Sequence, residues 1–175
     1  TQDIPQGLQW VRTAAERGNA LAMWFLGSWY LNGIHLAENP VMAVSWFQQG
    51  AELGDASCQL SLAECMDEGV GCQKNRQKAM EWLQKSAKQG FADAQLRIGW
   101  CYKAGDGIKA DASEAARLFR LAAEQGNAEA QNALALCLER AEGLRQDSAE
   151  AVIWFRKAAE QGFAHAQLNL ACSYR

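Results

Sequence analysis

The side chains best suited to chemistry in this sequence are its six cysteines and two histidines. A zinc site needs several Cys or His ligands at short spacing, but His35 and His165 are separated by most of the chain. Catalysis by a serine of the Ser-x-x-Lys type needs a lysine three residues later, and no serine of this sequence has one. Neither a Gly-x-Ser-x-Gly elbow nor a phosphate-binding Gly-x-x-x-x-Gly-Lys-Ser/Thr loop is present. The sequence therefore predicts no metal, no cofactor and no catalytic residue, and an enzyme (a hydrolase) is the least favoured function.

Three of the cysteines, Cys65, Cys101 and Cys137, follow one another at intervals of 36 residues. If each interval adds one packed helical layer, neighbouring copies lie about 8–10 Å apart. A disulfide needs Cα atoms within roughly 7 Å of each other. Cys58 and Cys65 stand too far apart along one predicted helix to pair. We expect small, buried free thiols, and these favour a reducing compartment.

Composition excludes several classes of function. The chain has 175 residues, of which 49% are hydrophobic, and 17 Lys+Arg against 20 Asp+Glu give a formal charge of −3. Proteins that bind nucleic acids or anionic membranes need an excess of basic residues, so neither class is expected. No apolar run approaches the roughly 18 residues of a membrane-spanning helix, so no direct membrane insertion is expected. We expect a cytoplasmic protein, with a periplasmic or secreted protein whose leader was removed as the alternative.

An internal repeat supplies the elements that must position any site. The segments that begin at residues 14, 50, 86, 122 and 158 read AAERGNALAM, GAELGDASCQ, SAKQGFADAQ, AAEQGNAEAQ and AAEQGFAHAQ. The glycines that mark this register are Gly18, Gly54, Gly90, Gly126 and Gly162, always 36 residues apart. Within each interval the apolar residues recur every three or four positions, as on one face of an α-helix. Each repeat is therefore expected to be two helices, a first helix after the register glycine and a second helix after a glycine-containing turn.

Capping residues predict where these helices begin. Second helices should start after Asn39, Asn75, Asp111 and Asp147, and three first helices after Asn19, Asp55 and Asn127. Phe91 and Phe163 stand where the other two first helices would need a cap. His35 and Ala141 replace turn glycines, so we expect their turns to be strained or differently shaped.

A single helical hairpin cannot bury its own apolar face, whereas stacked neighbours form one continuous core. The expected fold class is all-α, a right-handed α/α solenoid of 36-residue helix-turn-helix repeats, with four full repeats and a half repeat at each end. We predict one repeat array over 1–175. Its parts are 4–17 (a second helix), 18–53, 54–89, 90–125, 126–161 (full repeats) and 162–175 (a first helix). No polar capping repeat is visible, so the sequence is expected to be part of a longer protein.

Four motifs give the repeat a familiar appearance: ADAQ at 92–95, IGWCY at 98–102, GDGI at 105–108 and WFRKAAEQG at 154–162. Together they closely resemble the Sel-one-like repeat (SLR) family, relatives of the tetratricopeptide repeats. The resemblance covers essentially the whole chain. It implies a protein-binding scaffold or adaptor, and in bacteria such proteins serve in envelope assembly, signalling or host interaction. It also implies, for secreted cysteine-rich members, a disulfide between a second-helix end and the next first helix; Cys58 matches the latter position, but no cysteine stands near Ala51 to pair with it.

In tetratricopeptide repeats the first helices line the concave face, and that analogy gives the candidate site. The residues predicted to bind a partner protein or peptide are Trp24, Leu60, Glu64, Asp67, Glu68, Leu96, Trp100, Lys103, Asn132 and Glu139. Trp24 and Trp100 are the anchors, because no other repeat has an aromatic residue at either position. The acidic residues would favour a basic partner. The alternatives are that both tryptophans are half-buried between first helices, that the acidic residues form a solvated face, and that the chain is an architectural spacer without its own recognition site. The sequence does not predict an oligomeric state.

Overall fold

The computed structural model describes residues 4–174, and within that range the chain is all-α, with ten helices joined by turns and no strand. It divides into two compact units at the boundary between Gln89 and Gly90. We call residues 4–89 unit 1 and residues 90–174 unit 2, and describe each by itself. The division falls at a predicted repeat boundary.

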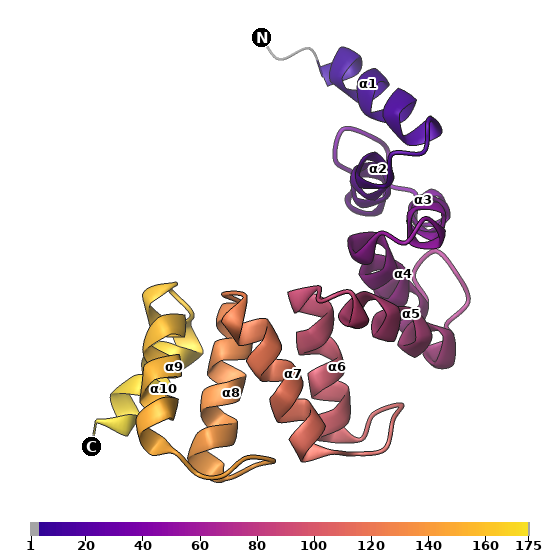
Figure 1. The fold of residues 1–175 in the computed structure, drawn as a ribbon. Coiled ribbons are helices and arrows are strands. Elements are labelled where there is room, and N and C mark those ends of the chain that lie inside the picture. Colours follow the sequence, from indigo (N-terminus) through magenta and orange to yellow (C-terminus); the bar gives the residue numbers. More distant parts are fainter. Residues whose placement is uncertain (1–3, 175) are drawn as a thin grey trace. The chain divides into compact units, whose positions relative to one another are not determined.

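Unit 1 contains the half repeat and the first two full repeats (Figure 1). Its helices are α1 (Ile4–Glu16), α2 (Ala20–Asn32), α3 (Pro40–Glu52), α4 (Ala56–Glu68) and α5 (Arg76–Lys88). The hairpins are α2 with α3 and α4 with α5, and α1 packs against α2. First helices are α2 and α4, as the register predicts.

Unit 2 repeats the arrangement with two full hairpins and a terminal first helix (Figure 1). Its helices are α6 (Ala92–Ala104), α7 (Ala112–Glu124), α8 (Ala128–Arg140), α9 (Ser148–Glu160) and α10 (Ala164–Ser173). First helices α6, α8 and α10 alternate with second helices α7 and α9, and each helix packs against its neighbours along the chain. The predicted pattern of paired helices is confirmed.

The predicted caps are confirmed at both kinds of helix. The side-chain oxygens of Asn19, Asp55 and Asn127 accept from the backbone N–H three residues later, at 2.8–2.9 Å. Asn39, Asn75, Asp111 and Asp147 cap the second helices in the same way. Phe91 and Phe163 make no side-chain cap, and α6 and α10 begin without one. Each cap satisfies a backbone donor that the helix itself leaves open.

The two turns in which His35 and Ala141 replace glycine keep the shape of the other turns and are strained. Ala141 and His35 have φ of 57° and 62°, close to the 67–79° of the turn glycines at the equivalent positions. A residue with a Cβ costs about 1–2 kcal/mol in this left-handed conformation. The turns therefore keep one geometry along the chain, and two of them hold it with a residue that does not favour it.

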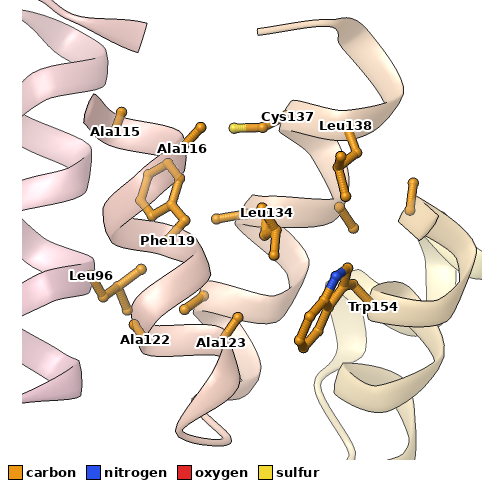
Figure 2. Packing of buried hydrophobic residues seen from close by; sticks show 14 of the residues in the cluster. Leu96, Ala115, Ala116, Phe119, Ala122, Ala123, Leu134, Cys137, Leu138 and Trp154 are labelled. Carbon is orange, nitrogen blue, oxygen red and sulfur yellow. The ribbon is translucent and has the colours of Figure 1, made fainter. Parts of the chain in front are cut away.

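The core of unit 2 is built around Phe119 of α7, which is fully buried. Figure 2 shows its ring between the helix that carries Leu96 and the helix that carries Leu134. A Cβ added at Gly99 would lie 2.7 Å from the ring, so the glycine of the IGWCY motif is the space into which the phenylalanine fits. Gly27 and Phe47 repeat this pairing in unit 1. Small and large residues at these two positions thus depend on each other.

Turns also contact the repeat before them. A Cβ added at Gly143 would overlap the Ala112 carbonyl at the start of α7, and one added at Gly71 would overlap the Pro40 carbonyl. Both glycines have positive φ. They are therefore required for two reasons, conformation and close backbone approach.

A ladder of buried glutamines ties first helices to second helices. Gln131 donates from Nε2 to the Ala123 carbonyl (3.2 Å), and its Oε1 accepts from Gln161 (2.8 Å). Gln59 makes the same two bonds, to Ala51 and from Gln89. These are the glutamines of the ADAQ motif, and the sequence alone assigns them no role. Buried amides that are fully bonded fix the register of the hairpins.

Candidate functional site

The predicted site maps onto the surface formed by the first helices, which we call the first-helix surface. In unit 1 this surface belongs to α2 and α4, and in unit 2 to α6, α8 and α10. Five of the predicted residues belong to unit 1 and five to unit 2, and each group is described by itself.

Trp24 is half-buried on α2, and its indole joins α2 to α4. Nε1 donates to Ser61 Oγ at 3.1 Å, and the ring packs against the core cluster around Phe47. Phe25 stacks edge-on against it, with ring centroids 5.3 Å apart. The indole is thus partly a structural bridge, as the alternative interpretation holds, and the residue stays partly exposed.

Trp100 is the corresponding bridge in unit 2. It is half-buried on α6, its ring lies against Phe119 with centroids 4.9 Å apart, and its Nε1 donates to Glu129 Oε1 of α8 at 3.2 Å. Lys103 lies one turn later, with Nζ 5.5 Å from the ring centroid. An aromatic ring, a carboxylate and an ammonium group therefore lie together on one accessible patch. We call Trp100, Lys103 and Glu129 the Trp100 patch.

Lys103 of this patch is held from the other side by Glu142. Its Nζ lies 2.6 Å from Glu142 Oε2, in the turn after α8. Both side chains are about one-third exposed, which makes the ion pair a weak contributor to stability. Its effect is positional, because it keeps the ammonium group near the tryptophan ring rather than free to move.

Three predicted contact residues are not on the surface. Leu60, Leu96 and Asn132 are only 8%, 6% and 8% exposed. Leu96 belongs to the Phe119 core, and the Asn132 amide oxygen accepts from Asn169 of α10 at 2.9 Å. These three side chains share the repeat position of the half-buried Trp24 and are covered by neighbouring helices, so they do not lie on the accessible surface where they were expected.

The predicted acidic group on α4 is partly neutralised. Asp67 forms an ion pair with Arg76 at the start of α5, while Glu64 is half-buried and Glu68 exposed. In unit 2, Glu139 is half-buried, and its carbonyl accepts from Gln146. Of the predicted acidic residues, Glu68 is the most accessible. Three partners of the predicted residues lie on a neighbouring helix, and no local sequence signal indicates them. They are Ser61 for Trp24, Arg76 for Asp67 and Glu129 for Trp100.

The cysteines are free thiols. Burial raises the pKa of Cys65 to about 12 and raises the pKa of Cys58 and Cys137 as well. Such thiols stay protonated at neutral pH and are poor nucleophiles. The prediction of buried thiols is confirmed for these three, holds only in part for the half-buried Cys72 and Cys101, and is wrong for Cys172, which is exposed at the end of α10.

In residues 4–174 no group of three or more His, Cys, Asp or Glu side chains could hold a metal ion. None of the helices over the same range is both long and apolar enough to span a membrane.

Stacked hairpins of about 36 residues, with half-exposed aromatic residues on the first helices, define an α-helical repeat scaffold. Comparison with protein families matches the Sel1 repeat model over residues 1–19, 20–55, 56–91, 92–127 and 128–163. The chain therefore belongs to the Sel1 repeat family, as its motifs indicate. The last four matched intervals each begin two residues after a register glycine. Comparison with curated proteins found no match.

Solved structures agree with this assignment. A protective antigen of uropathogenic Escherichia coli with an SLR fold is 31% identical over 94% of this chain, with a TM-score of 0.85. A Sel1 repeat protein of Oxalobacter formigenes is 28% identical over 90% of the chain, with a TM-score of 0.84. This chain covers 35% of the first protein and 64% of the second. An immunity protein of Pseudomonas aeruginosa, 20% identical with a TM-score of 0.66, shares the fold; 95% of this chain and 61% of that protein are covered.

Proposed function

We propose that this protein is a non-catalytic interaction scaffold that binds a partner protein on its first-helix surface. The observation that carries the proposal is the Trp100 patch. A half-exposed indole beside a carboxylate and an ammonium group offers both apolar area and charge, the combination typical of protein-binding hot spots. Trp24 provides a second, separate anchor in unit 1.

The charge of these surfaces favours a partner segment with basic side chains. Glu129 is exposed beside Trp100, and Glu68 is exposed at the end of α4. Exposed carboxylates attract cationic groups over roughly one Debye length, about 8 Å at physiological salt. A partner bound in this way is expected to dissociate faster as salt is raised.

Relatives support protein binding as the class of function. The P. aeruginosa neighbour is named an immunity protein, and the E. coli neighbour a protective antigen. These names describe those proteins, and only the shared scaffold fold applies to this chain without further argument. Partner identity has to come from capture experiments.

A crosslinking pull-down from cells that contain the protein tests the proposal. The baits are the native chain, Trp100→Ala and the matched control Trp82→Ala. Trp82 is also half-buried but lies on second helix α5, with Lys85 Nζ 3.8 Å from its ring centroid. We expect a partner captured by the native chain and by Trp82→Ala and lost with Trp100→Ala, at unchanged helicity. If Trp100→Ala captures the same partner as the native chain, the proposed surface is wrong.

A second candidate function is an architectural spacer. It is favoured by the hydrogen bonds of both anchors, since the N–H groups of Trp24 and Trp100 are satisfied by Ser61 and Glu129 of the same chain. A spacer would tolerate Trp100→Ala and Trp24→Ala without any change in captured proteins and would show only reduced stability. The same pull-down therefore separates the two functions.

A further inference from the structure

One repeat position carries a tyrosine in three of the repeats and not in the others. Tyr30, Tyr102 and Tyr174 stand 12 residues after their register glycines, where Met66 and Leu138 stand in the remaining repeats. All are near the end of a first helix, next to the turn.

For two of the three tyrosines, Tyr30 and Tyr174, the hydroxyl contacts an arginine of the preceding second helix, whereas Tyr102 has Gln84 at the equivalent position. In unit 1, Arg12 donates from Nη2 to the Tyr30 hydroxyl at 3.4 Å. In unit 2, Arg156 donates from Nη2 to the Tyr174 hydroxyl at 2.8 Å. Each arginine precedes its tyrosine by 18 residues. The same contact thus occurs in both units of the protein.

The pair formed by the third and fourth full repeats keeps the arginine, on α7, and lacks the tyrosine, on α8. Arg120 is the equivalent of Arg12 and Arg156, and Leu138 stands at the tyrosine position. Without a phenol oxygen to bind, Arg120 donates to Glu150 Oε1 at 2.7 Å. The same carboxylate oxygen accepts from Trp154 Nε1 at 3.1 Å. Arg120 is therefore held in place by α9 instead of by a tyrosine.

A cavity of about 490 Å³ lies at this position. We call it the phenol cavity, and its walls include Arg120, Leu138, Leu144, Arg145 and Glu150. Leu138 lines this cavity and is itself buried in the hydrophobic cluster of unit 2, where Figure 2 labels it. This volume lies within the range of about 300–1,000 Å³ that is typical of ligand sites. The cavity is larger than one aromatic ring, so it leaves space for the backbone on either side of that ring.

We infer that the phenol cavity binds the side chain of a tyrosine from a partner protein segment, in the place where other repeats carry their own tyrosine. The ring lies on Leu138 and Leu144. The hydroxyl accepts from the Arg120 guanidinium, as Tyr30 and Tyr174 do, and donates to the Glu150 carboxylate. A hydroxyl can do both at once, because it has one donor hydrogen and two lone pairs.

Repeat symmetry also supplies variants that should keep the fold. Leu138→Tyr gives this repeat the residue of Tyr30, Tyr102 and Tyr174, and so fills the cavity from within. Arg120→Gln gives it the residue of the equivalent positions Gln48 and Gln84. Arg156→Gln is the matched control, because that guanidinium already contacts Tyr174, away from the cavity.

The test is an NMR titration of the isotope-labelled protein with acetyl-Gly-Tyr-Gly-amide, acetyl-Gly-Phe-Gly-amide and p-cresol. We expect the tyrosine peptide to shift the Leu138 methyl and Arg120 side-chain signals, and the phenylalanine peptide to bind at least about threefold more weakly. Leu138→Tyr should abolish binding, Arg120→Gln should remove the preference for tyrosine, and Arg156→Gln should change neither.

Two results would overturn the inference. One is the absence of binding by the tyrosine peptide, or equal binding by the native chain and Leu138→Tyr. The other is p-cresol binding as tightly as the peptide, which would assign the cavity to free phenols and not to a protein segment. The peptide titration does not involve Trp100. A negative titration would therefore leave the proposed function intact, and a negative pull-down with Trp100→Ala would leave this inference intact.

Discussion

At the scale of single residues, the positions that depart from the repeat pattern carry the most information. Ala141 and His35 hold a left-handed conformation that glycine adopts at the equivalent turns. Leu138 stands where three repeats have tyrosine, and it lines the phenol cavity. Such departures are visible only because the other repeats define what is normal.

Replacing Ala141 by glycine should stabilise the protein. The backbone already has φ of 57°, so Ala141→Gly removes the strain of a Cβ in this conformation, worth about 1 kcal/mol. The reverse change at the equivalent turn, Gly105→Ala, should destabilise by a similar amount. Urea denaturation followed by circular dichroism measures both. Equal midpoints for native and Ala141→Gly proteins would show that the turn is not strained.

The buried Gln131 should matter more than its exposed equivalent Gln167. Gln131→Leu removes two hydrogen bonds, one to the Ala123 carbonyl and one from Gln161, at a cost of about 0.5–1.5 kcal/mol each. Gln167 makes the equivalent bond to the Ala159 carbonyl but is exposed to water. Gln167→Leu should therefore cost less in the free energy of unfolding, and a larger loss for Gln167→Leu would contradict the account.

At the scale of helices, each hairpin depends on matching a small residue of the first helix to a large one of the second. Gly99 faces Phe119, and Gly27 faces Phe47. At the equivalent positions, Ala63 is matched with Leu83 by the repeat register, while Ala135 occurs with Phe155. The packing therefore accepts a Cβ only with some adjustment, either of the ring or of the helix.

A double-mutant cycle measures this match. Gly99→Ala places a methyl group 2.7 Å from the Phe119 ring, and Phe119→Leu empties part of the core. The double variant reproduces the combination of Ala63 and Leu83. We therefore expect its loss in free energy of unfolding to be smaller than the sum of the two single losses by about 0.5–3 kcal/mol. Strict additivity in denaturation experiments would show that the two positions are independent.

The ion pair between α7 and α9 makes a pH prediction. Hydrogen bonds from Arg120 and then Trp154 lower the pKa of Glu150. A carboxyl group whose pKa is lowered in the folded state stabilises the folded protein at pH values above its pKa in the unfolded chain, about 4.3. This contribution disappears as the pH falls through the pKa of the folded state. The stability difference between native and Glu150→Gln proteins should thus be largest near pH 7.

The same difference should shrink steadily below about pH 4, because the native Glu150 is then protonated as well. Thermal unfolding over a pH series checks this. Glu124→Gln, at the exposed end of α7, is the control and should change the pH dependence little. A difference that stays constant down to pH 2 would mean that the Glu150 charge does not matter.

Helix boundaries could be predicted from the sequence because caps are local. Asn39 and Asp147 accept hydrogen bonds from backbone N–H groups only three residues away, so the residues that form each cap stand close together in the sequence. The exposure of first-helix residues could not be predicted in this way. Trp24 finds Ser61, and Asn132 finds Asn169, each 37 residues away in the chain, and it is the stacking of neighbouring helices that brings these groups together.

At the scale of the whole molecule, two compact units each carry their own core and their own part of the first-helix surface. Repeat proteins gain stability from each repeat and from the contacts between neighbours. The surface can therefore change from one repeat to the next without loss of the fold. The Trp100 patch and the phenol cavity are two such local changes, both in unit 2.

The central claim is that the Trp100 patch binds a partner protein, and site-directed photocrosslinking tests it most directly. A photoreactive amino acid at exposed Ala104, one turn after Trp100 on α6, is compared with one at exposed Ile153 on second helix α9. We expect one specific protein adduct from position 104, lost when Trp100 is changed to alanine, and none from position 153. An adduct from position 153 alone, or one from position 104 that survives Trp100→Ala, would contradict the claim.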